Sequence, residues 1–261
     1  MLKQQKTEKP AGAGKKEALR VVFDSRLKLE FHGSKVTSDA GLLAYRELDA
    51  ALGLTDLGDE LLNDWRTGKN TQHSRVALMR QSIFSRLAGY EDTNDAERLS
   101  VDPTMRQVVG GRATEHTAAS TSEMGRFETE VLTQPRNLKA LTKLSGKWID
   151  RLRERQPMRE LILDMDSSVS CHDFVDNQVR LQLFVLAYNL GNFLRQAVLP
   201  PAVRHWTLTT LREKLIKIGA KVVRHSRKIV FQMAEVAVPR ELFQTILERI
   251  GRLRLASAMT G

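Results

Sequence analysis

Two aspartates spaced two residues apart follow an apolar run near the middle of the chain. Residues 161–163 (Leu-Ile-Leu) precede Asp164 and Asp166, and this composition predicts a buried strand. Because the side chains of a strand alternate between its two faces, Asp164 and Asp166 lie on the same face. Carboxylate oxygens suit Mg²⁺, and two such ions about 4 Å apart can hold the attacking and leaving oxygens of a phosphoryl transfer. The pair is a candidate catalytic and metal-binding site; a merely solvated strand end is the alternative.

Positive charge is concentrated at the two ends of the sequence. The 261 residues include 41 Lys and Arg against 31 Asp and Glu, a net charge of +10. Residues 172–261 hold fourteen basic and six acidic side chains, and residues 1–20 hold six and two, whereas residues 21–171 hold twenty-one and twenty-three. Charge concentrated in this way attracts a polyanion through counterion release, so we expect a nucleic acid as the partner. A basic surface that is simply solvated is the alternative.

The predicted contacts to DNA phosphates come from these two basic segments. In the N-terminal segment they are Lys15 and Lys16. In the C-terminal segment they are Arg204, Lys214, Lys217, Lys221, Arg224, Arg227 and Lys228. We expect double-stranded DNA to bind through them mainly at its phosphates.

Composition also excludes several classes of protein. The single cysteine, Cys171, excludes a disulfide scaffold and any zinc site built from several thiolates. The longest apolar run, residues 183–188, is far shorter than the roughly 20 residues that a membrane-spanning helix needs. No charged-then-apolar leader opens the sequence. We therefore expect a soluble cytoplasmic protein that does not bind membranes.

Apolar periodicity predicts that helices dominate the fold, which we assign to the α+β class, mainly helical. Helices are expected at residues 42–52 (cap Ser38, stop Gly53), 76–87 (stop Gly89), after Asp102-Pro103, after the capping-box residues 120–123, and at 138–152, 177–198, 208–218 and 239–253. Strands are expected at residues 27–31 and 161–166, with a hairpin of residues 221–224 and 228–238.

These elements suggest four parts. Residues 1–20 are polar and predict a disordered basic arm. Residues 21–155 form an N-terminal, mainly helical domain. Residues 156–176 hold the strand with the aspartate pair, and residues 167–176 are expected to be a loop. Residues 177–261 form a helix-helix-hairpin-helix unit.

Three stretches of the chain resemble a known protein family. They are SDAGLL (38–43) with AGYEDTND (88–95), LILDMDSS (161–168), and NQVRLQLFVLAYNLGNFLRQ (177–196) with its continuation at residues 211–243. In these stretches the chain resembles the DDE-type transposases of bacterial insertion sequences, whose catalytic domain has a ribonuclease-H-like fold. The third stretch is the most specific of the three.

The resemblance implies a catalytic site and also shows a gap in it. The first catalytic aspartate of such transposases maps onto Asp166, with Asp164 as its near neighbour. The second aspartate, in a Gly-Asp-Ala/Ser turn, and the glutamate from a helix before residue 177 have no counterpart in the sequence. Glu213 and Glu235 follow the 177–196 segment, on the wrong side of it. The resemblance therefore implies a remnant of the ribonuclease-H-like fold, with most of the central sheet deleted near residues 170–174.

Two functional hypotheses remain open from the sequence. As an enzyme, the chain would bind the terminal inverted repeats of an insertion sequence and catalyse Mg²⁺-dependent cleavage and transfer of DNA strands. The missing acids imply instead an internally shortened, catalytically incompetent form of such a transposase. As a non-catalytic derivative, it would bind DNA and act as a transposition inhibitor, or be a remnant with no role. The resemblance implies double-stranded DNA as one partner, and a second copy or an intact transposase as another.

Overall fold

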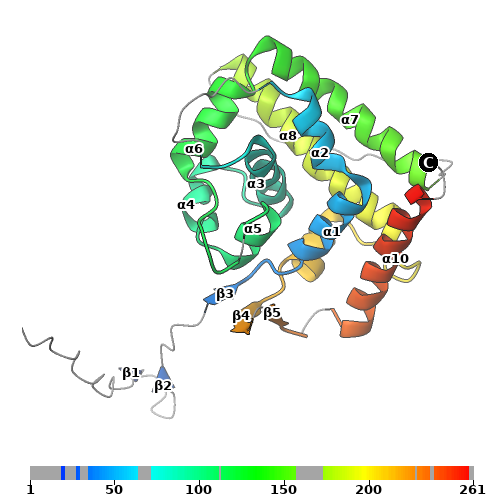
Figure 1. Cartoon of the computed structure of the whole chain (residues 1–261). Helices are drawn as coiled ribbons and strands as arrows, with labels where there is room; N and C mark the ends of the chain where they lie inside the picture. The colour runs from blue at the N-terminus through cyan, green and yellow to red at the C-terminus, as the bar shows by residue number, and fades with distance from the viewer. Residues whose placement is uncertain are drawn as a thin grey trace, which may run out of the picture. The chain divides into compact units, whose positions relative to one another are not determined.

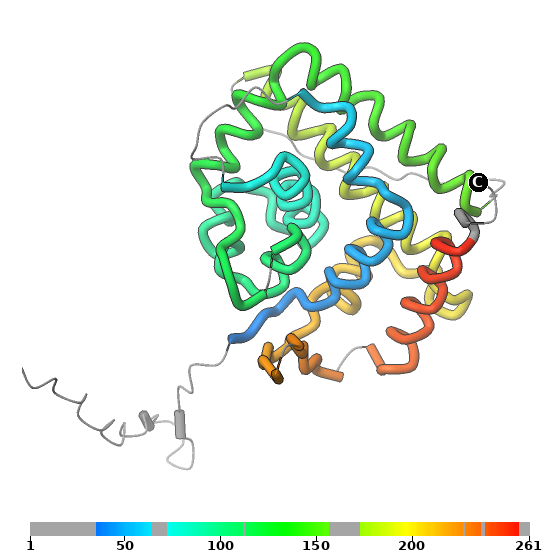
Figure 2. Tube along the Cα trace, viewed as in Figure 1, coloured from blue at the N-terminus to red at the C-terminus, as the bar shows by residue number. Residues whose placement is uncertain are grey.

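The computed structural model of the chain describes residues 35–63, 72–111, 113–156, 173–226, 228–235 and 238–258, together with two short strands, β1 (Leu19–Arg20) and β2 (Lys28–Leu29). β1 and β2 pair antiparallel and belong to a small unit of their own, Met1–Ser34. β2 coincides with part of the strand predicted at residues 27–31. The remaining described residues belong to the second unit, Lys35–Gly261, whose course Figure 2 shows.

Helices make up most of the second unit (Figure 1). The α-helices are α1 (Leu42–Leu52), α2 (Leu54–Leu61), α3 (Arg75–Leu87), α4 (Ala96–Leu99), α5 (Pro103–Val108), α6 (Thr121–Arg126), α7 (Pro135–Arg155), α8 (Phe174–Phe193), α9 (Leu208–Leu211) and α10 (Arg240–Ala258). The shorter helical turns are the 3₁₀ helix η1 (Thr93–Asp95) and the π-helical η2 (Phe127–Val131), η3 (Leu194–Val198) and η4 (Arg212–Ile216). The predicted class, α+β and mainly helical, is confirmed.

A three-stranded antiparallel sheet lies beside the helices, in the order β3 (Lys35–Thr37), β4 (Ala220–His225) and β5 (Lys228–Met233). The hairpin of β4 and β5 confirms the predicted turn, where Ser226 has a left-handed φ of 56°, as tight hairpins often require. β3 was not predicted. It pairs with β4 through Thr37 and Ala220, so a segment from the start of the unit completes a sheet from its end.

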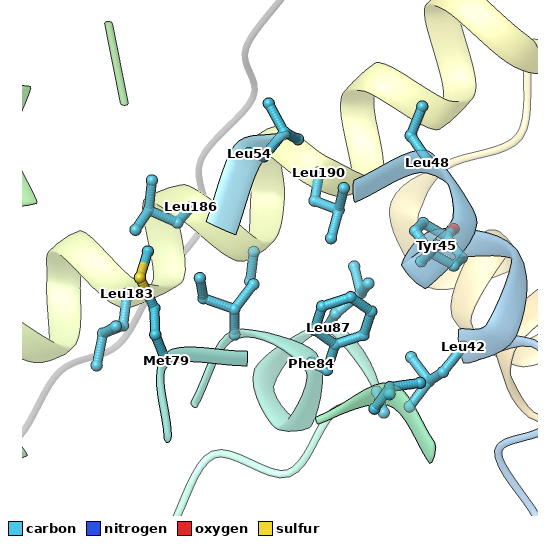
Figure 3. Close-up of a cluster of buried hydrophobic side chains, with 14 of the residues drawn as sticks. Leu42, Tyr45, Leu48, Leu54, Met79, Phe84, Leu87, Leu183, Leu186 and Leu190 are labelled. Carbon is cyan, nitrogen blue, oxygen red and sulfur yellow. The ribbon is translucent and has the colours of Figure 1, made fainter. Parts of the chain in front are cut away.

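One hydrophobic core holds the second unit together. Figure 3 shows part of it, where leucines of α1, α2 and α8 meet Met79, Phe84 and Leu87 of α3. The core reaches from Leu42 to Leu253 and includes the fully buried Trp148 of α7. Residues before position 157 and residues after position 172 therefore contribute to the same buried interior. None of the helices that the structure describes is both long and apolar enough to cross a membrane.

Most of the helix ends follow local signals in the sequence. The Asp102 carboxylate accepts a hydrogen bond from Met105 N at 2.8 Å, and the Ser120 hydroxyl accepts one from Glu123 N at 3.4 Å. Gly53 ends α1 with a φ of 65°, a conformation that favours glycine. The predicted caps at Asp102 and Ser120 and the stop at Gly53 are confirmed.

Two of the predicted boundaries are wrong. Ser38 does not cap α1, because the helix begins after Gly41 without a side-chain cap. The predicted loop 167–176 ends at Asp173, because the Asp173 carboxylate accepts a hydrogen bond from Val175 N at 2.9 Å and caps α8 at Phe174. An N-cap at Asp173, four residues before the predicted start at residue 177, accounts for the earlier start of the helix.

The segment before α1 is in direct backbone contact with the segment before β4. Ala40 N donates to Ile218 O at 3.0 Å, and Gly41 N donates to Ile216 O at 3.2 Å. A Cβ atom added to Gly41 would lie 1.6 Å from the carbonyl oxygen of Leu215. Glycine is thus required at position 41 because two backbones approach too closely for any side chain.

We expect Gly41→Ala to destabilise the folded chain by about 3 kcal/mol or more, the upper end of what overpacking costs, because the methyl group would collide with rigid backbone. Urea unfolding followed by circular dichroism measures this change. Gly146→Ala is the matched control, since no atom lies within 4 Å of its added Cβ in the middle of α7. The control should gain about 0.5–1 kcal/mol from helix propensity. Equal stabilities of the two variants would contradict the prediction.

Candidate nucleic-acid interface

The predicted catalytic and metal-binding pair, Asp164 and Asp166, lies outside the described residues, as do Lys15, Lys16 and Arg227. Among the residues that the structure describes, no three His, Cys, Asp or Glu side chains come together in a way that could hold a metal ion. The assignment of Mg²⁺ to the aspartate pair stays a prediction.

Lys217 lies in a partly buried polar cluster with Asp39 and Tyr90. Its Nζ is 2.8 Å from Asp39 Oδ1 and 4.0 Å from the centroid of the Tyr90 ring. The Tyr90 hydroxyl donates to Asp39 Oδ2 at 2.8 Å, and Asp39 is only 2% exposed. The cluster joins residues from the SDAGLL, AGYEDTND and 211–243 stretches, which are far apart in the sequence.

The electrostatics of the cluster favour the charged form of Lys217. Burial alone would lower the pKa of Lys217, but hydrogen bonds to Asp39 and Tyr90 and the attraction of Asp39 outweigh it, so this pKa is raised. Burial raises the pKa of the nearby Asp102, against the hydrogen bonds from Met105 and Thr37. The ammonium group of Lys217 is thus held against a carboxylate, which reduces the positive potential it offers to DNA.

Three other predicted DNA contacts also have partners within the chain. Lys214 Nζ lies 5.1 Å from the ring centroid of Trp206, a cation–π distance. Arg224 Nη1 is 3.6 Å from Glu115 Oε1, although its side chain remains 64% exposed. Arg204, on the turn after η3, has Nη2 at 3.5 Å from Leu199 O. Arg224 and Arg204 remain exposed at the surface.

Lys221 and Lys228 are the predicted contacts with the freest side chains. Both are exposed on the β4–β5 hairpin, and neither forms an ion pair with a described carboxylate. The structure thus separates the predicted set into lysines that hold the fold together, such as Lys217, and lysines that point into solvent.

A second row of basic side chains, which the sequence analysis missed, lies on α7. It consists of Arg136, Lys139, Lys143 and Lys147, all exposed. No acidic residue occurs between positions 135 and 149, and no described carboxylate pairs with these four. Their spacing of three, four and four residues is the helical signal that could have identified them. In Figure 1 α7 lies at the opposite edge of the unit from the β4–β5 hairpin.

Not every charged cluster belongs to a surface. Arg86 of α3 and Glu128 of η2 form a paired contact at 2.9 and 2.8 Å, and both residues are 4% exposed. The Ser82 hydroxyl donates to the same carboxylate at 2.9 Å, and the Arg86 guanidinium lies 5.3 Å from the Phe184 ring centroid. This ion pair is buried and joins α3 to η2 in the core, although Arg86 Nε has no hydrogen-bond partner among the described residues.

Comparison with protein families identifies the family of the chain. The sequence profile of the family described as Transposase DDE domain group 1 matches residues 19–170 and 167–255. The chain belongs to this transposase family. Its members use divalent metal ions and act on DNA, so DNA is a partner of this chain by family. No curated protein sequence and no solved structure matches the chain.

We expect Lys217→Met to lower the free energy of unfolding at neutral pH by about 2–4 kcal/mol, because it leaves the buried Asp39 without its cation. The double variant Lys217→Met/Asp39→Asn should recover part of this loss. Lys139→Met, which removes an exposed lysine, should change stability by less than about 0.5 kcal/mol. Chemical unfolding of the four proteins measures the differences, and a loss no larger than that of Lys139→Met would contradict the assignment.

The same ion pair predicts a pH dependence. Because the pKa of Lys217 is raised in the folded chain, its stabilising contribution is complete below the unfolded lysine value of about 10.4 and is lost as the pH rises through the folded value. The stability difference between the wild type and Lys217→Met should therefore stay constant from neutral to mildly alkaline pH and shrink only above that value. A difference that shrinks near pH 7 would point to another group.

Proposed function

We propose that this member of the transposase family binds double-stranded DNA through two separate basic surfaces and does not cleave it. One surface is the β4–β5 hairpin with Lys221 and Lys228, and the other is the α7 row. The observation that carries the proposal is that both surfaces hold exposed cations without described carboxylate partners, in a chain whose family acts on DNA. The expected DNA is the terminal inverted repeat of an insertion sequence.

The α7 row has the geometry of a phosphate contact. Helical rise places Arg136 and Lys147 about 16 Å apart along the axis, with two lysines between them. Side chains at such spacing can follow one strand of the DNA backbone and release its counterions. Contacts from this row cannot distinguish one DNA sequence from another, because the phosphates are the same at every base pair.

The missing acids support the proposal that cleavage has been lost. The family resemblance requires three acidic residues, and this sequence offers Asp166, with Asp164 beside it, before the chain continues into α8. The two matched segments overlap at residues 167–170, as expected if the block that normally separates them were absent. Phosphoryl transfer depends on positioning and charge stabilisation, so an incomplete set of ligands would lose nearly all of the rate.

The shared core favours a folded DNA-binding protein over a remnant with no role. Residues before and after the junction pack into one hydrophobic interior, and the Asp39–Lys217 pair links the two parts. A chain that occupies the element ends without cutting them would compete with an intact transposase and inhibit transposition. A second copy or an intact transposase is the expected protein partner.

We expect DNA binding by the full chain to weaken steeply with salt, measured by fluorescence anisotropy on a labelled duplex. Each phosphate contact contributes about 0.9 to the slope of log affinity against log salt, so Lys143→Ala/Lys147→Ala should lower the slope by about two. Arg254→Ala is the control that also removes an exposed cation. Because Arg254 is already paired with Glu47 at 2.8 Å, this variant should leave the slope unchanged. Binding that is absent or insensitive to salt would contradict the proposed function.

We also expect the purified chain to leave DNA uncut. A supercoiled plasmid that carries the inverted repeats flanking the coding sequence, given Mg²⁺ or Mn²⁺, should yield neither relaxed circles nor joined products on a gel. The control is Asp166→Ala, which should behave as the wild type does. Nicking by the wild type that disappears in Asp166→Ala would show that the site is complete.

A further inference from the structure

One face of the three-stranded sheet is turned to solvent. The register places Lys221 opposite Gln232, Val223 opposite Val230, and His225 opposite Lys228. Side chains alternate along a strand, so these six share one face, and Val36 of β3, opposite Lys221, joins them. This set is called the outer face. The other face carries Ala220, Phe231 and Met233, which pack near Phe243 of α10.

Burial confirms that the outer face is uncovered. Along β5 exposed residues alternate with half-buried ones, and Lys228, Val230 and Gln232 are the exposed members. Val36 is 63% exposed and Val230 is 38% exposed. These β-branched residues leave apolar surface open to water beside the polar residues of the same face, and a partner can cover it.

The chemistry of the outer face identifies the class of partner. It holds two lysines and a histidine and no carboxylate, so it complements a polyanion. Gln232 offers an amide that can both donate and accept hydrogen bonds, as base edges require, and the valines offer apolar contacts of the kind that recognise a thymine methyl group. A surface that bound only phosphates would have no use for the glutamine and the valines.

We infer that the outer face enters the major groove of DNA and reads its sequence, with Lys221 and Gln232 as the base-contacting residues. The major groove is wide enough to admit a two-stranded β-ribbon. β3 pairs only with residues 220–222 of β4, so beyond them β4 and β5 form such a ribbon with a basic tip, and Lys221 and Gln232 lie at its base. Lys221 and Gln232 are direct cross-strand neighbours, so both can reach the same or adjacent base pairs. Lys228 and His225 near the turn then lie closest to the phosphates at the edge of the groove.

This inference rests on the DNA binding proposed above and goes beyond it, because it assigns sequence reading to one face and sequence-independent affinity to α7. The test selects bound duplexes from a randomised pool with the full wild-type chain and determines their sequences. Gln232→Ala and Lys221→Ala should each lose discrimination at one or two base pairs, by about tenfold or more. Affinity of Gln232→Ala for an unselected duplex should stay within about twofold, because an uncharged residue adds little to non-specific binding.

Two control variants distinguish recognition of the DNA sequence from non-specific binding. Gln244→Ala removes an exposed glutamine of α10 that donates to Glu248 at 2.9 Å, and the selected sequence should not change. Lys143→Ala should weaken binding to all duplexes equally and leave the selected sequence intact. Melting temperatures within a few degrees of wild type exclude unfolding, since surface substitutions shift stability by about 0.5 kcal/mol or less.

The outcomes distinguish the inference from the proposed function. Salt-dependent binding without any selected sequence, or with one that Gln232→Ala and Lys221→Ala both leave unchanged, would overturn the inference and leave the proposed function standing. Loss of all salt-dependent binding would overturn the proposed function itself. A double-stranded RNA of the selected sequence should compete at least about tenfold less well, because its major groove is too narrow for a sheet. Equal competition would also overturn groove reading.

Discussion

The pairing of residues 37–41 with residues 216–220 is the constraint on which the described fold depends. It combines the Thr37–Ala220 register of the sheet, the backbone hydrogen bonds of Ala40 and Gly41, and the ion pair of Asp39. Single hydrogen bonds contribute only about 1 kcal/mol each, but here they act at one place and fix one geometry. Because α1 begins directly after Gly41, this pairing sets where Leu42 and Tyr45 enter the core.

The hairpin surface is built on this framework, because β4 supplies Ala220 to it, and α7 packs into the same hydrophobic core. The sheet presents Lys221 and Gln232 outward because its other face packs near Phe243. α7 presents its lysines outward because Trp148 is buried on the opposite side, with its indole N–H donating to Leu54 O at 2.8 Å. Rigid elements hold their charges at fixed positions, so less conformational entropy is lost on binding.

The sequence predicted the features that depend on neighbouring residues, and it did not predict the features that depend on contacts between residues far apart in the chain. The caps at Asp102 and Ser120 and the hairpin turn follow from neighbouring residues. β3 has only three residues and forms because β4 offers it an edge, which no local pattern reveals. Lys217 and Lys221 were both predicted as DNA contacts because they lie in the same basic segment. Only the ion pair of Lys217 with Asp39 in the folded chain distinguishes the two. The α7 row was missed because the net charge was summed over residues 21–171, where basic and acidic side chains almost balance.

The distance in sequence between Gly41 and its partners also has a consequence during synthesis. The N-terminal helices emerge from the ribosome about 180 residues before the segment that closes over Gly41. At about 5–20 residues per second this is roughly 10–40 seconds, during which the face of α1 that carries Leu42 and Tyr45 has no C-terminal cover. A nascent chain in that interval exposes apolar surface that chaperones can bind, and a product terminated before residue 215 would keep it exposed permanently.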